Sequence, residues 1–194
     1  MRGEPVRLFD EPVSGRRVFR PGGFLLAMKG VGNFAGFAKR ELTEEDTVLE
    51  GVKRLVSEKA SPEAIHDAAV QALSGLPRYS WVGIYMVEGI ELVLKSWKGP
   101  QPTQHVRIPI GEGVCGAAAR SGKTEVVADV SKDPRYLECF PSTKSEIVVP
   151  IKDGTRVYGE IDVDSDTLAA FGEKDRLFLE KLAFQIMLGV RGKV

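Results

Sequence analysis

Two cysteines carry the most reactive side chains in this sequence. Cys115 follows the segment GEGV (111–114) and begins an alanine-rich stretch, where the N-terminal end of a helix would stabilise a thiolate. Cys139 lies among proline, serine and charged residues, which predicts a loop that a small substrate can reach. The alternative is that a cysteine serves as a small apolar side chain. This alternative suits Cys115 better, because a polar loop offers Cys139 less packing.

Carboxyl groups form the second reactive feature. Asp162 and Asp164 alternate with Ile161 and Val163 in a predicted strand, so both acids point to one face of a sheet. Glu146 begins a neighbouring strand and can reach the same face. The acids line either solvent or a polar pocket, and the first is the more common use of an antiparallel sheet. In a pocket, clustered negative charge would keep at least one acid protonated as a general acid.

Aromatic and histidine side chains are the remaining candidates. Trp81, Gly83 and Tyr85 share one face of a predicted strand, where they either pack in the core or form a ligand wall that glycine lets a ligand approach. His66 is interpreted as an exposed or hydrogen-bonded residue of a helix, and His105 as a polar strand residue. Two histidines without a zinc-type cysteine pair argue against a metal site, and no phosphate-binding loop occurs. We therefore expect neither metal nor organic cofactor.

Hydrophobic periodicity predicts the elements that position these side chains. Thr43 and Ser61 are typical helix caps, and the apolar spacing after them is helical. Two-residue turns at 88–89 and 153–154 indicate hairpins. The predicted helices are 43–56, 61–73, 115–120 and 173–190; the predicted strands are 80–87, 90–97, 105–110, 125–129, 146–151 and 157–163; residues 131–145 form a loop. This order predicts an α+β fold, an antiparallel sheet with helices mainly on one face.

Composition restricts the class of protein. A chain of 194 residues with 43% hydrophobic residues is typical of one globular domain. Its 27 basic and 27 acidic residues cancel, which argues against a nucleic-acid or membrane-surface partner. No apolar run approaches the roughly 18 residues that a membrane span needs. Two cysteines cannot form the disulfide framework of a small secreted domain, so we expect a cytoplasmic protein with reduced thiols.

The N-terminal part has a different composition. Residues 1–40 contain eight lysines and arginines against three acids, together with many glycines and prolines. They show no sustained helical or strand period, which predicts a basic extension ahead of a domain at 41–194. An alternative is that translation begins at Met28.

Four stretches together resemble the GAF-fold free methionine-(R)-sulfoxide reductases. They are WVGIY (81–85), VRIPIGEGVCG (106–116), CFPSTKSEIVVP (139–150) and GEIDVDS (159–165). Any one of them could occur in a GAF domain of another function, whereas the combination is more specific. The resemblance covers roughly Thr43 to the C-terminus. It implies a GAF-like domain over 41–194 with a ligand pocket on the face opposite the helices.

The resemblance also implies a thiol mechanism. Cys139 corresponds to the nucleophile, which forms a sulfenic acid on reducing free methionine (R)-sulfoxide, and Cys115 to one of the family's recycling cysteines. A second thiol then closes a disulfide with the nucleophile. Thioredoxin or a similar thiol reductant would then restore the enzyme. Trp81 and Tyr85 match the aromatics around the substrate's methyl group.

Glu146, Asp162 and Asp164 match the family's acidic cluster, which binds the substrate ammonium and polarises its S=O bond. His105 stands where family members commonly carry a further cysteine. Either Cys115 takes over its resolving step, or an external thiol does so, or the activity is lost. His105 itself acts as a base, stabilises a thiolate, or has no role in the reaction.

Two other classes of function remain open. One is a GAF sensor that binds a small ligand without catalysis, because a fold alone does not fix an activity. The other is a structural module, a homodimer joined through its terminal helices.

Overall fold

The computed structural model describes residues 41–193. The basic extension predicted at 1–40 and the alternative start at Met28 lie outside these residues. The elements are α1 (Glu44–Ser57), α2 (Pro62–Leu73), β1 (Trp81–Glu88), β2 (Glu91–Lys98), β3 (Arg107–Pro109), α3 (Gly113–Ser121), β4 (Glu125–Val127), the 3-10 turn η1 (Val130–Lys132), β5 (Ser145–Asp153), β6 (Arg156–Ser165) and α4 (Glu173–Val190). None of the helices found there has the length and apolar character of a membrane span.

The predicted helix starts follow from capping. The Thr43 hydroxyl accepts a hydrogen bond from the Asp46 N–H at 3.1 Å, and the Asp46 carboxylate accepts one from the Thr43 N–H at 3.1 Å. Ser61 caps α2 by accepting from the Ala64 N–H at 3.2 Å. These bonds satisfy N–H groups that have no partner within the helix. α4 begins and ends at the predicted residues.

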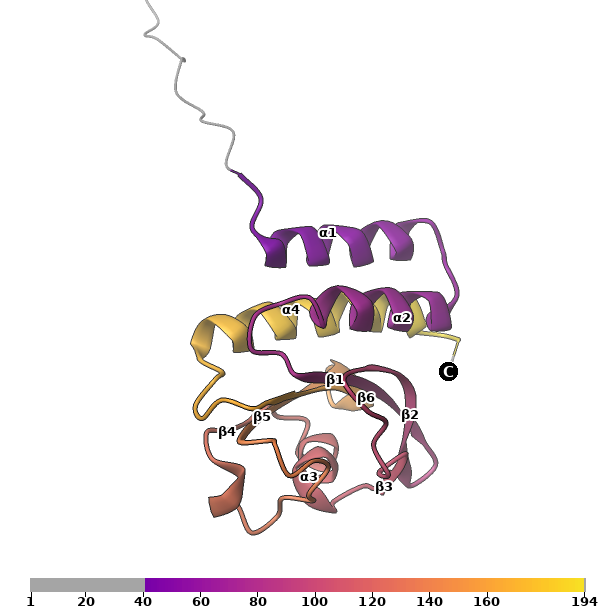
Figure 1. The fold of residues 1–194 in the computed structure, drawn as a ribbon. Helices are drawn as coiled ribbons and strands as arrows, with labels where there is room; N and C mark the ends of the chain where they lie inside the picture. The colour runs from indigo at the N-terminus through magenta and orange to yellow at the C-terminus, as the bar shows by residue number, and fades with distance from the viewer. Residues whose placement is uncertain (1–40, 194) are drawn as a thin grey trace, which may run out of the picture. The chain divides into compact units, whose positions relative to one another are not determined.

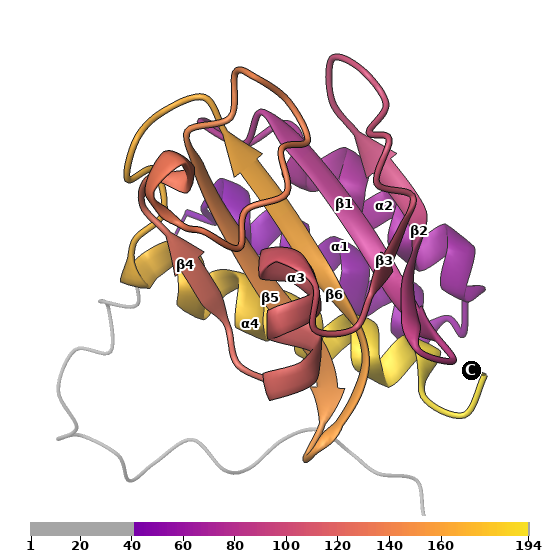
Figure 2. The same ribbon diagram turned by 90° about the horizontal axis from the view of Figure 1, so that it is seen from below.

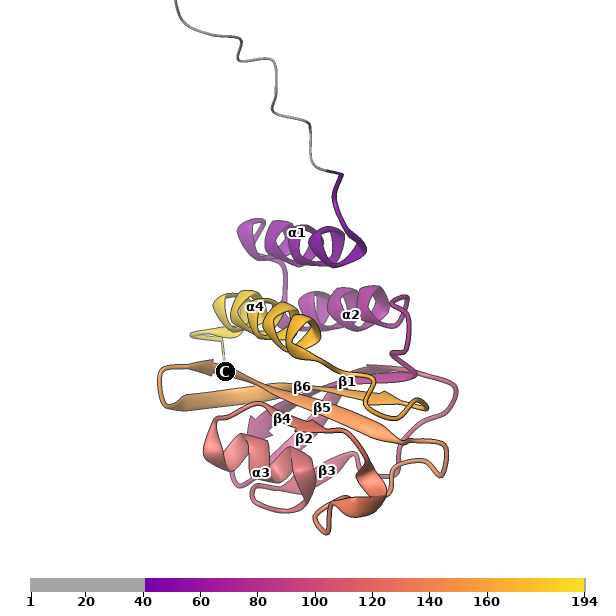
Figure 3. The ribbon, with the colours of Figure 1, turned by 90° about the vertical axis from the view of Figure 1, so that its left-hand side faces the viewer.

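One antiparallel sheet of six strands, in the order β3-β2-β1-β6-β5-β4, forms the middle layer. α2 and α4 cover one face with α1 outside them, whereas α3 and the long connections cover the other face (Figures 1 and 3). This confirms the predicted α+β fold, an antiparallel sheet with most helices on one side. The register of β1 and β6 places Trp81 opposite Asp164 and Gly83 opposite Asp162.

Each face of the sheet has its own apolar core. Val82, Ile84, Ile161 and Val163 pack with the residues of α1, α2 and α4. On the opposite face Trp81 and its neighbours pack with α3. The alternation of side chains along β1 and β6 therefore separates two interiors rather than an interior and a solvated surface.

Among the predicted boundaries that the structure corrects, three have a local cause. β3 is shorter than 105–110, because the His105 N–H donates to the Thr103 hydroxyl at 3.0 Å and leaves the sheet ladder. The helix predicted at 115–120 is longer and ends at Gly122, whose left-handed φ of 63° suits glycine. β4 ends before 129, because the Asp129 carboxylate caps η1.

Candidate active site

Four carboxyl groups meet on the face of the sheet that α3 covers. Glu146 is the second residue of β5, and Glu160, Asp162 and Asp164 alternate along β6; each residue is at most 5% exposed. The interpretation of Asp162 and Asp164 as a solvated face was therefore wrong. α3 and the connections on either side of it lie over these strands (Figure 2), and the four acids are buried beneath them.

Glu160 is the member of the cluster that sequence reasoning missed. Its signal was present, because residues 160, 162 and 164 have the two-residue spacing that identified the two aspartates. In β1–β6 pairing Glu160 lies opposite Tyr85. It is completely buried, and neither of its oxygens has a hydrogen-bond partner in the described residues.

The cluster lacks compensating positive charge. Glu146 Oε2, Asp162 Oδ1 and Asp164 Oδ2 also have no hydrogen-bond partner in residues 41–193, and none of the four carboxyls forms an ion pair there. Burial, followed by the charge of Asp162, raises the pKa of the other three acids well above the ordinary range. Burial raises the pKa of Asp162 itself to about 7. The site thus holds protons near neutral pH, and a cationic ligand bound there would favour the ionised carboxylates.

Cys115 lies beside this cluster. It occupies the first turn of α3, is buried, and its thiol donates to Glu146 Oε1 at 3.8 Å. Burial, and then the negative charges of Asp162 and Glu160, raise its pKa well above the ordinary value. The expected stabilisation of a thiolate by the helix end was therefore wrong in direction, because desolvation and several carboxylates outweigh the partial charge of one helix terminus.

Cys139 lies in the loop between η1 and β5 and is half-buried against the same apolar cluster as Cys115. Burial and the charges of Asp162 and Asp164 raise the pKa of its thiol, whereas a hydrogen bond with Thr103 lowers it. Both thiols are free and protonated at neutral pH. A positive charge brought into the site would lower both thiol pKa values.

The aromatic side chains form the wall next to the acids. Trp81 is buried between Trp97, stacked at 6.3 Å between ring centroids, and Phe140 at 5.9 Å. Its indole N–H has no hydrogen-bond partner in the described part of the chain. Tyr85 is buried and donates its hydroxyl to the His105 carbonyl at 2.9 Å.

The glycine in this wall serves the indole rather than a ligand. A Cβ placed on Gly83 would lie 2.5 Å from Trp81 ring carbons, and one on Gly99 would lie 2.2 Å from the same ring. Both glycines therefore leave the volume that Trp81 fills. The interpretation of Gly83 as open space for a ligand was wrong.

The two histidines have different surroundings. His105 is half-buried, and its Nε2–H donates to the Glu138 carbonyl at 3.2 Å, next to Cys139 in sequence. This hydrogen bond therefore links His105 to the loop that carries Cys139. His66 is buried in α2, away from this face, and neither ring nitrogen has a hydrogen-bond partner in residues 41–193. The interpretation of His66 as exposed or hydrogen-bonded was wrong.

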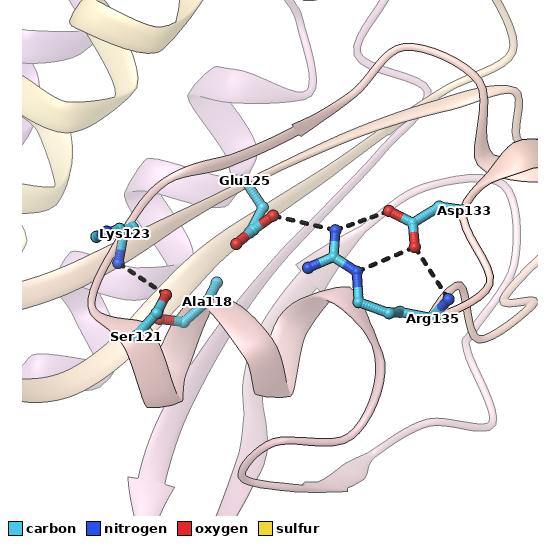
Figure 4. A network of polar contacts seen from close by, with 6 residues as sticks. All are labelled: Ala118, Ser121, Lys123, Glu125, Asp133 and Arg135. Atoms are coloured by element: carbon cyan, nitrogen blue, oxygen red, sulfur yellow. Dashed lines mark hydrogen bonds and ion pairs between the residues drawn. The ribbon is translucent and has the colours of Figure 1, made fainter.

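Arg135 anchors the loop that carries Cys139. Its guanidinium pairs with Asp133 at 2.7 Å and with Glu125 of β4 at 3.1 Å, so the loop is tied to the sheet edge (Figure 4). Where α3 ends nearby, the Ser121 hydroxyl donates to the Ala118 carbonyl and accepts from the Lys123 N–H.

Cys115, Glu146 and Asp162 can also hold a metal ion. One ligand atom from each of these residues lies within 4.8 Å of the other two.

The fold and the site define a GAF domain with a covered acidic cluster on one face of its sheet. The family model of the GAF domain matches residues 61–190, and the chain belongs to this family. Among its relatives is the free methionine-R-sulfoxide reductase of Saccharomyces cerevisiae, 41% identical over 109 residues, which are 54% of this chain and 59% of the yeast protein. The GAF domain-containing protein A of Dictyostelium discoideum is 41% identical over 105 residues, 54% of this chain and 65% of that protein. The chain thus spans less than two thirds of these two relatives.

Solved structures similar to this chain also include free methionine-R-sulfoxide reductases and other GAF proteins. The free methionine-R-sulfoxide reductase of Neisseria meningitidis in complex with its substrate aligns with a TM-score of 0.70 and 35% identity, covering 77% of this chain and 92% of that one. A Burkholderia vietnamiensis protein described as a GAF sensor aligns with a TM-score of 0.69 and 34% identity, covering 74% and 91%. The relatives therefore include enzymes that act on sulfur and a protein described as a sensor.

Proposed function

We propose that this protein reduces free L-methionine (R)-sulfoxide to methionine with a thiol as reductant. The observation that carries the proposal is the buried acidic cluster without a cation, next to two free cysteines and an aromatic wall. An amino acid with a neutral sulfoxide side chain brings an ammonium group that would balance this charge. The relatives named free methionine-R-sulfoxide reductase support the same substrate.

The acids have two tasks in this proposal. Glu146, Asp162 and Asp164 bind the ammonium group and hold the sulfoxide oxygen, which needs a proton as it leaves sulfur. Their raised pKa values favour a carboxyl that is still protonated at neutral pH, as a general acid must be. Trp81 and Tyr85 surround the methyl end, which suits the apolar part of the substrate.

Cys139 is the nucleophile. Its sulfur attacks the substrate sulfur and forms an S–S bond while the sulfoxide oxygen takes up a proton. The hydroxyl group then moves from the substrate sulfur to the Cys139 sulfur as the S–S bond breaks, which leaves a sulfenic acid on Cys139 and releases methionine. The thiol proton passes to a carboxylate, and the protonated acid supplies the proton that the oxygen takes up. The ammonium group of the bound substrate offsets the charges that otherwise raise the thiol pKa.

Cys115 restores the enzyme. Its thiol condenses with the Cys139 sulfenic acid, which releases water and forms a disulfide that thioredoxin or a similar thiol protein reduces. Support comes from the apolar cluster that both cysteines share. His105, at the position of the further family cysteine, acts in this proposal through its bond to Glu138, by positioning the loop of Cys139.

The covered site favours a free amino acid over a peptide. Every acid in the cluster is at most 5% exposed, so a substrate bound there is enclosed. A peptide chain would need an exit beside the ammonium and carboxylate groups.

The test is thiol-dependent release of methionine from the (R) and (S) epimers, each as free amino acid and in a peptide. We expect turnover of the free (R) epimer alone, and none in Cys139→Ser. Turnover that persists in Cys139→Ser would reject the nucleophile, and equal use of the peptide would reject the free substrate.

The second candidate is a non-catalytic sensor of a small cationic ligand. It is favoured by the raised thiol pKa values and by His105 in place of a cysteine. Calorimetry separates the two, because a sensor would bind methionine sulfoxide or another amino acid without releasing product under reducing conditions.

A further inference from the structure

Three donor groups of the site surround one point. The Cys115 sulfur and one oxygen each of Glu146 and Asp162 lie within 4.8 Å of one another, and the sulfur is 3.8 Å from Glu146 Oε1. A tetrahedral zinc ion with Zn–S and Zn–O bonds of usual length separates a sulfur and an oxygen ligand by about 3.6 Å. The Cys115 sulfur and Glu146 Oε1 are thus already close to this separation, and the Asp162 donor lies within 4.8 Å of a donor atom of each.

A second observation points to a cation independently of this spacing. Glu146 Oε2 and Asp162 Oδ1 are buried without a hydrogen-bond partner in the described residues, and so are both oxygens of the neighbouring Glu160. An unpaired buried carboxylate is costly, so the cluster gains from any positive charge that can enter. Glu160 also interacts electrostatically with Cys115 and Asp162, although it does not belong to the three-residue donor set.

We propose that Cys115, Glu146 and Asp162 bind a thiophilic divalent cation of the zinc class. One thiolate with two carboxylates suits a borderline-soft ion, whereas Mg²⁺ and Ca²⁺ take oxygen ligands alone. Competition between this ion and methionine sulfoxide rests on the proposed function, since both use Glu146 and Asp162. The bound ion also holds Cys115, so it blocks the recycling thiol.

The two cysteines provide a matched pair of variants. Cys139 is half-buried and does not belong to the three-residue donor set, although it shares the apolar cluster. An ion in this site must therefore depend on the Cys115 thiol and not on the Cys139 thiol.

The experiment titrates the reduced, metal-free full-length protein with Cd²⁺ and follows the ultraviolet thiolate-to-cadmium charge-transfer band. We expect one Cd²⁺ per chain, displacement by Zn²⁺, and no displacement by Mg²⁺. The band should disappear in Cys115→Ser and persist in Cys139→Ser. Asp162→Asn, which keeps both thiols, should weaken binding at least tenfold, with circular dichroism as the check of folding.

Two outcomes would overturn the proposal. One is the absence of a band in the folded wild-type protein; the other is a band lost in Cys139→Ser and retained in Cys115→Ser. Failure of the proposed function looks different, because a protein without reductase activity would still give the Cys115-dependent band. If cadmium binds but does not raise the apparent KM for methionine sulfoxide, the competition is rejected.

Discussion

At the scale of single residues, Asp162 affects the pKa values of most other reactive groups in the site. Its charge is among the causes that raise the pKa of Cys115, Cys139, Glu146 and Glu160. It also lies opposite Gly83 in β1 and Val148 in β5, at the centre of the sheet. After burial, the charge of this one carboxyl is the largest effect on the pKa of both thiols.

Asp162→Asn should lower the pKa of the Cys139 thiol, because removal of a negative charge favours the thiolate. The measurement is the pH dependence of alkylation by iodoacetamide in a Cys115→Ser background, where only one thiol reacts. Asp162→Glu keeps the charge and is the control. A Cys139 pKa that is the same in both variants would contradict this electrostatic role.

Cys115→Ser should separate the first turnover from recycling. We expect about one methionine per chain in a single-turnover assay, followed by at least a tenfold loss of the steady-state rate with thioredoxin. Quantifying methionine against enzyme concentration checks this expectation. An undiminished steady-state rate would show that another thiol resolves the sulfenic acid.

At the scale of elements, β1 depends on a small residue beside its own tryptophan. Gly83→Ala places a methyl group 2.5 Å from the Trp81 ring, which must shift within a packed cluster. We expect a loss of about 1–3 kcal/mol in the free energy of unfolding, the usual cost of overpacking. Urea unfolding followed by tryptophan fluorescence measures it.

Gly51→Ala is the matched control, because its Cβ in α1 would meet no atom within 4 Å. Alanine there should stabilise the helix by up to about 1 kcal/mol. If Gly83→Ala changes the free energy of unfolding in the same way as Gly51→Ala, the packing of Trp81 does not depend on Gly83.

The loop that carries Cys139 depends on Arg135. Arg135→Ala removes exposed pairs to Asp133 and Glu125, so the free energy of unfolding should change by less than about 1 kcal/mol. The loop loses its tie to β4, and kcat/KM for the sulfoxide should fall several-fold. Lys53→Ala, which removes an exposed pair in α1, should leave kcat/KM unchanged. Equal kcat/KM in both variants would exclude a role for this anchor.

At the scale of the whole molecule, the buried acids set the pH dependence of stability. Their pKa values are raised in the folded state, so between their unfolded values near 4 and the folded value of about 7 for Asp162 the folded protein binds more protons. Stability is therefore present at low pH in this window and is lost as pH rises. His66 acts in the opposite direction below about 6.5, because burial lowers its folded pKa.

Four acids outweigh one histidine, so the free energy of unfolding should fall by about 2 kcal/mol or more between pH 5 and pH 7.5. Denaturant unfolding across this range measures the change, and Asp162→Asn should make the dependence shallower. A stability that rises over the same range would mean that the acids are ionised and compensated in the folded protein.

Local chemistry was sufficient to predict the elements. Caps at Thr43 and Ser61, the bounds of 173–190 and the shared face of Asp162 and Asp164 depend on residues within a few positions of one another, and the structure agrees with each. The four stretches of the resemblance likewise predicted the GAF fold. The same period-two pattern could also have predicted that Glu160 shares the face of Asp162 and Asp164.

Only the tertiary structure determined the burial and the pKa shifts of the reactive side chains. Whether Asp162 faces water depends on α3 and the connections around it, which come from far earlier in the chain than β6. The same cover reverses the expected pKa shift of Cys115, and packing between α2 and the rest of the domain buries His66. Periodicity tells which side chains share a face, but burial and pKa depend on what the folded chain brings over that face, because desolvation and charge act through space rather than along the sequence.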